Sequence, residues 1–394
     1  MLHVLHVSQQ FPCEAYPALG VMVQSSVRSL APLCEQSVLA PRPYTLPLPG
    51  FPYGQLALLP ERRIESGYWV HRPRYLYPVP KSLFYPQAGP AMALSVSRYA
   101  PQLERPDVIH AHWSYPDGAA ASVLRERFRS ALVVHARGTL ERVIAEQSPR
   151  YRAMIGRPLQ AADAVVANSE ALYEDCLRLG VKPAQLTVIP NGVDTECFKP
   201  RDKAESKRAL GLSDERVLIL YCGNLREVKG VDLLAQVITP LCAARPKLDF
   251  ALVGSGELEG RLHRELGPLI KARRVLMPGA LPQAQVAQYM QAADLLVLPS
   301  RSEARGNVIL EALACGTPVA AADVGGIPEL MRPSHGRLFA PGCTQTLMRT
   351  LLALSDDPAQ LAQLGAAASA YVEQSGLSWQ AHGTALHALY QRLL

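Results

Sequence analysis

Two glutamates that stand eight positions apart, Glu303 and Glu311, lie in the segment SEARGNVILEALACG at residues 302–316. An apolar run at 294–299 comes directly before this segment. A run of strand length, a polar turn and a helical pattern that stops at Gly316 predict strand, loop and helix. One carboxylate would then lie in the loop at the carboxyl end of a parallel strand, and the other about one turn into the helix.

This placement suits a phosphorylated ligand. Ligands of open α/β sheets bind at the carboxyl ends of the strands. The start of the helix adds unpaired backbone N–H groups and the positive end of the helix dipole, both of which attract phosphate. The spacing alone is a weak signal, because most glutamates are simply solvated, so the surrounding sequence has to decide.

A second candidate segment is the glycine-bounded turn GNLREVKG at 223–230, which follows a strand-like run at 217–222. It can bring Lys229 and Arg226 to the same sheet edge as the Glu303 loop. There the two cations would stabilise the charge that grows on a diphosphate leaving group. The alternative is a pair of solvated cations.

Another glycine turn, at Gly254 and Gly256, follows the strand expected at 249–253. It fails the dinucleotide-binding fingerprint, because residue 259 is a glutamate and Gly260 comes one position late. The turn is expected to contact the base or ribose of a single nucleotide. A tight turn that needs glycine for its backbone angles is the alternative.

In the first half, the segment HAHW places His110 and His112 on one face of a strand, with His112 nearer the sheet edge. His110 is expected to be buried support. Gly20 stands at the start of a helical pattern, where it would let the backbone approach a ligand closely. Arg137 follows the strand expected at 131–135, and a surface arginine is one interpretation of it.

The elements that position these residues alternate between apolar strands and helical patterns along the whole chain, which indicates βα units and parallel sheets. Two Rossmann-like domains are therefore expected, with a linker in the segment VIPNGVDTECFKP at 188–200. The expected strands are 2–7, 37–40, 107–110, 131–135, 164–167 and 186–189, followed by 217–222, 249–253, 275–277, 295–298 and 319–322.

The proline-dense region 41–90 differs from the rest and should form loops, edge strands or polyproline turns. Its aromatic and basic patch YWVHRPRYLY at 68–77 has two interpretations. It would touch an anionic acceptor or a membrane surface, or it is a proline-rigidified surface with aromatic rings packed beneath.

Composition excludes several classes of protein. Apolar runs are strand-sized, and residues 1–7 lack an export signal, so a cytoplasmic protein is expected, with peripheral contact at the inner face of the membrane left open. The eight cysteines form no Cys-x-x-Cys pair, which predicts reduced thiols and no zinc site. Residues 1–190 hold most of the net charge of +6, which favours an anionic partner, but without a basic run typical of nucleic-acid binding.

The segment 295–329, including CGTPV and VGGIPE, resembles the nucleotide-sugar site of the retaining glycosyltransferases of family four. In that family the first glutamate contacts the donor sugar, the second binds the ribose hydroxyls, and helix-start amides hold the diphosphate. The resemblance gives these roles to Glu303, Glu311 and the backbone at Gly306, Asn307 and Val308.

The resemblance extends to other candidates, with departures. Lys229 matches the family lysine and Gly223 the first glycine of its turn, but the family arginine is replaced by Asn224, and Arg226 would have to substitute for it. His112 resembles the N-terminal histidine near the donor sugar. The loop before Gly20 often carries two glycines in the family and has one here. Arg137 stands where relatives often have histidine, and the resemblance makes it a candidate for holding a charge of the acceptor.

The resemblance implies an α/β fold of two Rossmann-like domains that face each other across a cleft (GT-B). Residues 1–190 would form the acceptor-side domain, 191–375 the nucleotide-sugar domain, and 376–394 a helix that packs back on the first domain. The expected catalytic residues are His112, Lys229 and Glu303. The expected donor-binding residues are Gly20, Gly223, Arg226, Gly254, Gly306, Asn307, Val308 and Glu311.

The function implied is retaining transfer of a sugar, with a UDP-sugar as the expected donor, to the hydroxyl of a carbohydrate or lipid-linked acceptor in cell-surface polysaccharide or glycolipid synthesis. No cofactor and no metal are expected, since lysine and the helix dipole supply positive charge and the chain has no Asp-x-Asp signature. Two alternatives stay open: a non-catalytic nucleotide-binding or scaffold protein, and a nucleotide-sugar epimerase on the same fold.

Overall fold

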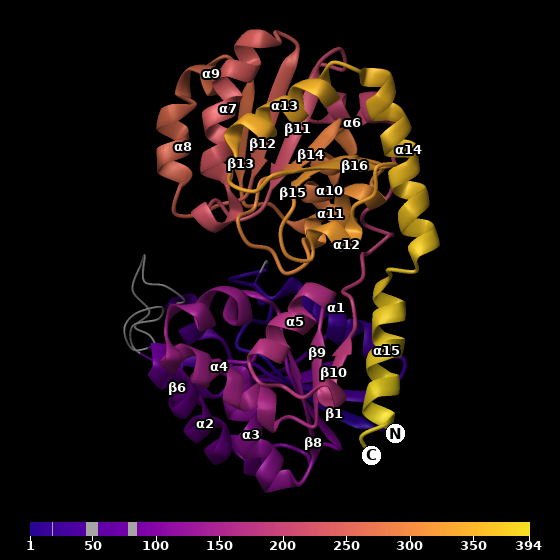
Figure 1. The fold of residues 1–394 in the computed structure, drawn as a ribbon. Helices are drawn as coiled ribbons and strands as arrows, with labels where there is room; N and C mark the ends of the chain where they lie inside the picture. The colour runs from indigo at the N-terminus through magenta and orange to yellow at the C-terminus, as the bar shows by residue number, and fades with distance from the viewer. Residues whose placement is uncertain (18, 45–53, 78–84) are drawn as a thin grey trace. The chain divides into compact units, whose positions relative to one another are not determined.

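The computed structural model describes residues 1–17, 19–44, 54–77 and 85–394 (Figure 1). The chain divides into two compact units, unit 1 with Met1–Asn191 and Trp379–Leu394, and unit 2 with Gly192–Ser378. Among the described residues, none of the helices has the length and apolar character needed to cross a bilayer.

Unit 1 is built on one sheet in the order β10-β9-β8-β7-β1-β2-β5-β4. All its neighbouring strands are parallel except β4, which pairs antiparallel with β5 at the edge. The strands are β1 (His3–Val7), β2 (Glu35–Leu39), β4 (Arg62–Glu65), β5 (Tyr68–His71), β7 (Val108–Ala111), β8 (Ala131–His135), β9 (Ala164–Ala167) and β10 (Leu186–Val188). The strand order reverses between β1 and β7, which are neighbours.

The proline-dense region contains more strand than its sequence predicts. Besides β4 and β5, the short strands β3 (Arg42–Tyr44) and β6 (Arg74–Leu76) pair in parallel. Tyr68, Tyr75 and Tyr77 are buried, whereas Trp69 is 44% exposed. Most of the patch therefore matches the packed-aromatic interpretation. The parts of this region at 45–53 and 78–84 lie outside the described residues.

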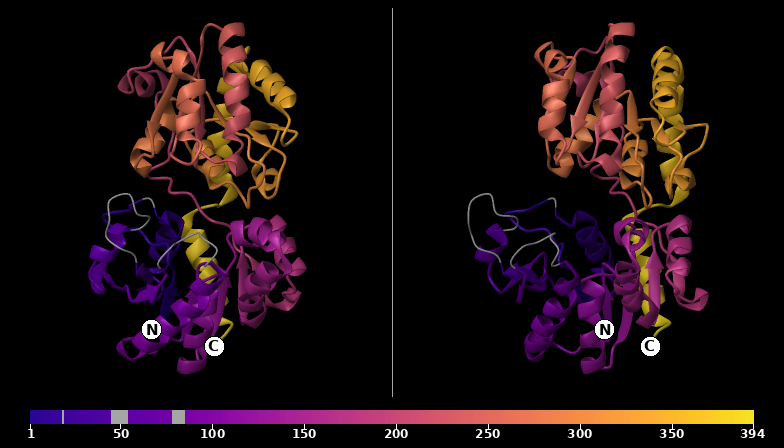
Figure 2. Two further views of the ribbon diagram at one scale, coloured as in Figure 1. Left: turned by 90° about the vertical axis from the view of Figure 1, so that its left-hand side faces the viewer. Right: turned by 60° about the vertical axis from the view of Figure 1, so that its left-hand side comes forward.

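The helices of unit 1 are α1 (Val21–Leu30), α2 (Ala88–Tyr99), α3 (Asp117–Phe128), α4 (Pro149–Ala161), α5 (Glu170–Arg178) and α15 (Trp379–Gln391). Although α15 comes last in the chain, it packs against α1 within unit 1 (Figures 1 and 2). His382 holds it there, with Nδ1 2.8 Å from the carbonyl oxygen of Pro190 and Nε2 2.9 Å from Oγ of Ser26.

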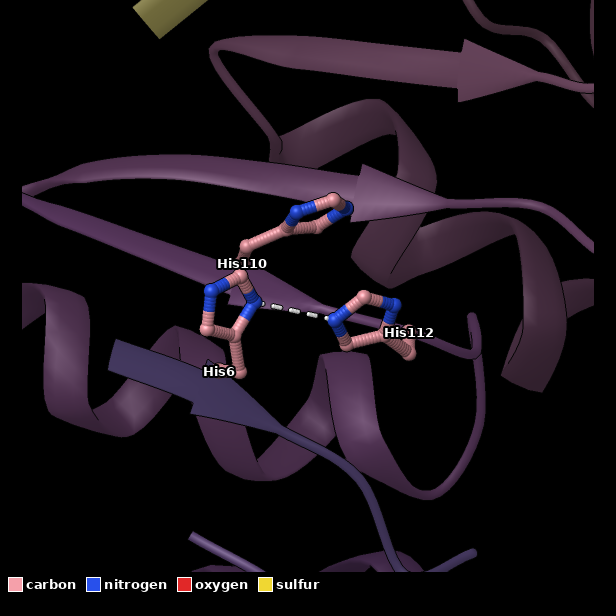
Figure 3. Close-up of side chains that lie close together, drawn as sticks. All are labelled: His6, His110 and His112. Atoms are coloured by element: carbon pink, nitrogen blue, oxygen red, sulfur yellow. Dashed lines mark hydrogen bonds between the residues drawn. The ribbon is translucent and has the colours of Figure 1, made fainter. Parts of the chain in front are cut away.

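Four histidines line the face of the unit 1 sheet that α15 covers. His6, His110, His112 and His135 have no solvent exposure, and the hydroxyl of Tyr390 on α15 lies 2.6 Å from Nδ1 of His110. Figure 3 shows three of the rings close together. Alternation along β1, β7 and β8 puts them beside Val4, Val108 and Val133 in one core, because residues i and i+2 of a strand share a face.

Unit 2 has a six-stranded parallel sheet in the order β13-β12-β11-β14-β15-β16. Its strands are β11 (Val217–Cys222), β12 (Leu248–Val253), β13 (Val275–Gly279), β14 (Leu295–Leu298), β15 (Val319–Ala322) and β16 (Gly336–Phe339). Read from β11, this is the order 3-2-1-4-5-6 of a doubly wound nucleotide-binding sheet. The order reverses between β11 and β14, so these strands form the topological switch point.

Helices cover both faces of this sheet (Figure 1). One core joins α7 (Val231–Ala244), α8 (Glu259–Glu265) and α13 (Thr344–Ser355) to one face. A second core joins α10 (Gln283–Ala292), α11 (Asn307–Ala314) and α12 (Ile327–Leu330) to the other. Leu218 and Leu220 point to the second core, whereas Ile219 and Tyr221 point to the first, as the alternation of a strand requires. The remaining helices are α6 (Lys203–Ala209), α9 (Gly267–Lys271) and α14 (Pro358–Ser375).

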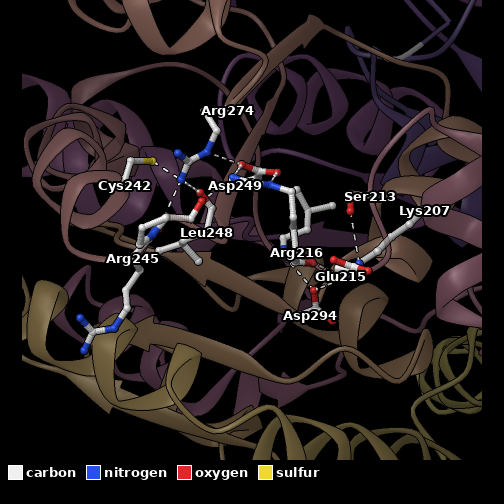
Figure 4. Close-up of polar contacts among 12 residues, drawn as sticks. Lys207, Ser213, Glu215, Arg216, Cys242, Arg245, Leu248, Asp249, Arg274 and Asp294 are labelled. Carbon is white, nitrogen blue, oxygen red and sulfur yellow. Dashed lines mark hydrogen bonds and ion pairs between the residues drawn. The ribbon is translucent and has the colours of Figure 1, made fainter.

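The amino-terminal edge of the unit 2 sheet is fastened by ion pairs (Figure 4). Asp249 accepts hydrogen bonds from Arg216 at 2.5 and 2.8 Å and from Arg274 at 2.7 Å. Asp294 accepts from Nζ of Lys207 at 2.6 Å and from the backbone N–H of Leu218 at 2.8 Å. These pairs join the starts of β11, β12 and β14, so this edge is structural.

The buried histidines make the stability of unit 1 depend on pH. Burial lowers the pKa of His6 to about 3 and the pKa of His110, His112 and His135 well below the ordinary value. The unfolded chain therefore binds more protons below about pH 6.5, and stability that is present above this pH is lost as the pH falls. Each ring should contribute a loss of about 1.4 kcal/mol per pH unit until its own folded pKa is reached.

The measurement is hydrogen exchange of peptides from β1, β7 and β8 as the pH is lowered from about 7.5 to about 5.5. Over this range, His135→Leu should reduce the loss of stability by about 1.4 kcal/mol in total. His263→Leu, at an exposed position on α8, is the matched control and should leave the slope of unit 1 unchanged. Equal slopes in wild type and His135→Leu would contradict this account.

Candidate functional site

The switch point of unit 2 brings a lysine and a glutamate into contact. Lys229 ends the turn Glu227–Lys229 after β11, and Glu303 lies in the loop after β14. Nζ of Lys229 donates to Oε2 of Glu303 at 2.7 Å, and both side chains are largely buried. The two sequence candidates, 74 residues apart, therefore meet at one point of the carboxyl edge.

Two further contacts hold these loops together. The guanidinium of Arg301 binds both carboxylate oxygens of Asp232 at 2.7 Å, and its backbone N–H donates to the carbonyl of Val228 at 2.9 Å. Gly230 has a φ of 67°, and a Cβ there would lie 1.8 Å from the carbonyl oxygen of Pro299. The loop after β14 thus packs directly on the turn that carries Lys229.

Helix α11 begins beside this pair. Gly306, with a φ of 81°, precedes its first residue, Asn307, and no side chain caps the helix. The first turn carries no acidic residue, so the positive end of the helix dipole can attract an anion. Among the described residues no basic side chain pairs with Glu311, which lies further along α11, and burial raises the pKa of its carboxyl to about 8.

Three helices share one kind of start. α1, α7 and α11 follow Gly20, Gly230 and Gly306, each with positive φ and no side-chain cap. By contrast, side chains cap α4, α5, α6 and α14 by accepting an N–H of the first turn, and they belong to Ser148, Ser169, Asp202 and Asp357.

The other donor-side candidates take separate positions. A Cβ at Gly254 would lie 2.0 Å from the carbonyl oxygen of Gly223, so these glycines allow the ends of β11 and β12 to touch. Arg226 lies 3.7 Å from a carboxylate oxygen of Glu257, and both side chains are more than half exposed. Arg226 therefore faces the loop after β12, while Lys229 pairs with Glu303.

The switch point of unit 1 holds the remaining candidates. Arg137 is buried; its Nε donates to the carbonyl oxygen of His112 at 3.0 Å, and its Nη2 donates to Nδ1 of His112 at 2.7 Å. Its Nη1 has no hydrogen-bond partner among the described residues. Burial lowers the pKa of Arg137 to about 10, and it raises the pKa of nearby Asp117 to about 8. Arg137 is thus not a surface arginine.

In this structure His112 and Gly20 contact other residues of unit 1. His112 is fully buried, and its second ring nitrogen, Nε2, lies 3.0 Å from Nδ1 of His6. A Cβ at Gly20 would lie 2.1 Å from the carbonyl oxygen of Gln10, so the close approach that requires glycine is to the chain's own backbone.

Sequence reasoning did not find His6, His135, Asp232 or Arg301. The period-two alternation of valine and histidine along β1, β7 and β8 was a usable signal for the two histidines. The pairing of Asp232 with Arg301 had no comparable signal, because 69 residues separate the two side chains in the sequence.

Two doubly wound sheets, one with a lysine–glutamate pair and an uncapped helix at its switch point, define a two-domain nucleotide-binding α/β protein. Residues 21–197 match the family described as Glycosyltransferase Family 4, and residues 202–371 match Glycosyl transferases group 1. The chain is 30% identical over 357 residues to the putative teichuronic acid biosynthesis glycosyltransferase TuaC of Bacillus subtilis, covering 89% of this chain and 88% of TuaC. The chain therefore belongs to glycosyltransferase family 4.

Other comparisons agree. A D-inositol 3-phosphate glycosyltransferase of Streptomyces bingchenggensis is 33% identical over 299 residues, which cover 71% of this chain and 65% of that protein. Sucrose-phosphate synthase of Thermosynechococcus elongatus has a similar fold, with a TM-score of 0.82 at 22% identity over 100% of this chain and 99% of that chain. Anabaena HepE in complex with UDP-glucose gives 0.76 at 21% identity, over 100% of both chains. These neighbours share the GT-B fold, and the protein is a glycosyltransferase.

The packing of Gly230 predicts a large cost for a side chain there. Gly230→Ala combines a left-handed backbone with a clash against Pro299, and should lower the free energy of unfolding by about 2 to 5 kcal/mol. Gly211→Ala is the matched control, because Gly211 has a φ of 70° but nothing within 4 Å, and should cost only about 1 kcal/mol. Urea denaturation measures both, and equal losses would show that the contact with Pro299 is unimportant.

Proposed function

We propose that the protein is a retaining, metal-independent glycosyltransferase that moves a sugar from a UDP-sugar to an acceptor hydroxyl. The observation that carries this proposal is the contact between Lys229 and Glu303 beside the start of α11. This arrangement offers positive charge for a diphosphate and a carboxylate for a sugar hydroxyl at one point.

Each residue of this site has a distinct role in the proposed reaction. Lys229 and the first amides of α11 stabilise the diphosphate as it departs, in place of a divalent cation. Glu303 orients the sugar ring by accepting its hydroxyls. Glu311 accepts the ribose hydroxyls, since its carboxylate has no cation of the described chain to satisfy it. HepE, whose fold is similar, has been solved with UDP-glucose, which supports uridine as the base.

The anomeric configuration is retained because the acceptor attacks the face of the sugar from which the diphosphate leaves. Glu303 is engaged by Lys229, which suits a positioning role better than nucleophilic attack. The acceptor oxygen therefore forms its bond to the anomeric carbon as the bond to the diphosphate oxygen breaks. The acceptor proton passes to the departing diphosphate, so no protein base is required.

The acceptor side belongs to unit 1. The buried guanidinium of Arg137 has one nitrogen with no partner among the residues that the structure describes, which favours an acceptor that carries a carboxylate or phosphate. TuaC is named for teichuronic acid biosynthesis, and an acidic cell-surface polysaccharide is the product class we propose here. A lipid-linked acceptor would add peripheral contact with a membrane.

The test begins with thermal shifts of the purified protein against UDP, GDP, ADP and their common sugar conjugates, because a ligand that binds the folded state raises Tm. The stabilising donor is then incubated with uronate and sugar-phosphate acceptors, with and without EDTA. Proton NMR of the first product gives its anomeric configuration. Inversion, or loss of transfer with EDTA, would contradict the proposed mechanism.

Lys229→Met in the same assay should lower kcat by about 100-fold or more, while nucleotide affinity changes less than tenfold, because the charge on the diphosphate grows in the transition state. Lys247→Met, at an exposed lysine beside the amino end of β12, is the matched control and should behave as wild type. Wild-type turnover in Lys229→Met would remove this lysine from the site.

Nucleotide binding should depend on the ionisation of Glu311. Ribose hydroxyls donate to the carboxylate, so binding favours the ionised form and releases a proton when the pH lies below the raised pKa of about 8. UDP affinity should rise with pH by up to about tenfold per unit and level off near pH 8. Glu311→Gln should remove the pH dependence that comes from this carboxyl. The phosphates of UDP titrate in the same way with both proteins, so their contribution remains. Parallel calorimetric pH profiles for the two proteins would contradict the role of Glu311.

A further inference from the structure

A line of hydrogen-bonded side chains runs through unit 1 from Gln36 to Arg137. Nε2 of His6 lies 3.0 Å from Oε1 of Gln36, and Nδ1 of His6 lies 3.0 Å from Nε2 of His112. Nδ1 of His112 lies 2.7 Å from Nη2 of Arg137. Figure 3 shows the middle contact, with the rings of His6 and His112 turned toward each other. Every ring nitrogen of both histidines is therefore engaged.

The chemistry of the two ends determines where the protons lie. Arg137 can only donate, so Nδ1 of His112 must carry a lone pair and its proton must sit on Nε2. That proton is donated to Nδ1 of His6, which leaves the proton of His6 on Nε2. Nε2 then donates to Oε1 of Gln36, an acceptor. One assignment satisfies all three contacts, and it requires both rings to be neutral.

The surroundings maintain this neutral state. Both rings are fully buried, and no carboxylate of the described chain lies within hydrogen-bond distance of them. Burial is the main cause that lowers the pKa of both histidines. The titratable groups that act on these two rings are His3, His110, His135 and Arg137. One step further out, His382 and Tyr390 face His110, and Asp117 and Glu141 act on Arg137.

We propose that His6 and His112 are positioning residues that hold the guanidinium of Arg137 in one orientation, with Nη1 directed to an acidic group of the acceptor. Gln36 fixes His6, His6 fixes His112, and His112 fixes Arg137 through both its ring and its carbonyl oxygen. Nη1 has no hydrogen-bond partner in the described part of the chain. The link to the acceptor rests on the proposed function, but the proton arrangement does not.

The same histidines offer a rival interpretation as a metal site. Ring nitrogens of His6, His110 and His112 lie within 4.8 Å of one another, and Nε2 of His110 has no partner among the described residues. A metal on Nε2 of His112 would move its proton to Nδ1. That N–H would then face the N–H of Arg137 at 2.7 Å, two donors in contact. The arginine thus disfavours a cation here, both by its donor and by its charge.

The test is NMR of the full-length protein labelled with 15N in histidine and arginine. Long-range proton–nitrogen correlations should show His6 and His112 both protonated on Nε2 at neutral pH. Zinc added at one equivalent should leave these signals unchanged. A proton on Nδ1 of either ring, or stoichiometric zinc that displaces it, would overturn the proposal with no variant needed.

Variants of His6 test the positioning itself, because this residue makes no direct contact with Arg137. In His6→Leu, rotation of the Arg137 guanidinium should accelerate by about tenfold, the equivalent of one charge-assisted hydrogen bond. In His6→Asn, Oδ1 can replace Nδ1 as acceptor, so slow rotation should be restored. His135→Leu, a buried histidine outside the line, is the control and should keep slow rotation. Slow rotation in His6→Leu would contradict the positioning role.

A titration with glucuronate and with inorganic phosphate separates this inference from the proposed function. Either anion should shift the Arg137 side-chain signals of wild type, and His6→Leu should require about tenfold more of it. A second outcome is that neither anion shifts the Arg137 signals while His6 and His112 still carry their protons on Nε2 and the guanidinium still rotates slowly. In that case the proposal of an acidic acceptor is wrong, and the positioning role of the two histidines is retained. If an anion binds equally to both proteins, the positioning role is wrong.

Discussion

The adjacency of β11 and β14 is the constraint on which the donor side of this glycosyltransferase depends. The two strands are parallel neighbours, but the helices that follow them lie on opposite faces of the sheet. Their loops must therefore diverge, and the space between them is filled by side chains from both. Lys229 and Glu303 meet there because sheet topology, and not sequence distance, decides which loops are adjacent.

The sheet of unit 1 also reverses its strand order, between β1 and β7, but different residue types fill its core. Where unit 2 fills its sheet faces with leucine, valine and alanine, unit 1 places neutral imidazoles on one face beneath α15. A buried imidazole stabilises less than an aliphatic side chain of similar size, and its polar atoms need partners. In return, hydrogen bonds join the interior to the carboxyl edge, which an aliphatic core cannot do. His382 and Tyr390 further tie the last helix into this core.

Much of the architecture was predictable from the sequence. Most of the β strands were visible as apolar runs of four to six residues. The helix-breaking residues predicted a linker at 188–200, and the two compact units meet at Asn191 and Gly192. The short strand β16 was missed, since GRLF at 336–339 is half polar. In the proline-dense region edge strands were expected, but their bounds were not located, because arginine and proline interrupt the apolar side chains around β3, β4 and β6. In these cases tertiary pairing, and not local preference, decides the structure.

Some residues of the candidate site could likewise be predicted from the sequence, and others could not. Glu303, Lys229 and the start of α11 could be found because local motifs carry them. The partners of the site residues could not be predicted, because 31 to 106 residues separate the members of each pair. The pairs are Arg226 with Glu257, Asp232 with Arg301, and His6 with His112. Burial of Arg137 was equally hidden, because a single arginine after a strand has no pattern that distinguishes core from surface.

The uncapped starts of α1, α7 and α11 bear on how this protein can be made more robust. A side-chain cap stabilises a helix by about 1 kcal/mol, and introducing one is a standard way to raise heat resistance. At Gly20, Gly230 and Gly306 the left-handed backbone resists that change, and a cap would occupy amides that an anion needs. Substitutions selected for heat resistance alone would therefore impair anion binding if they fell at these three glycines. Stabilising substitutions are better placed at the amino edges of the sheets.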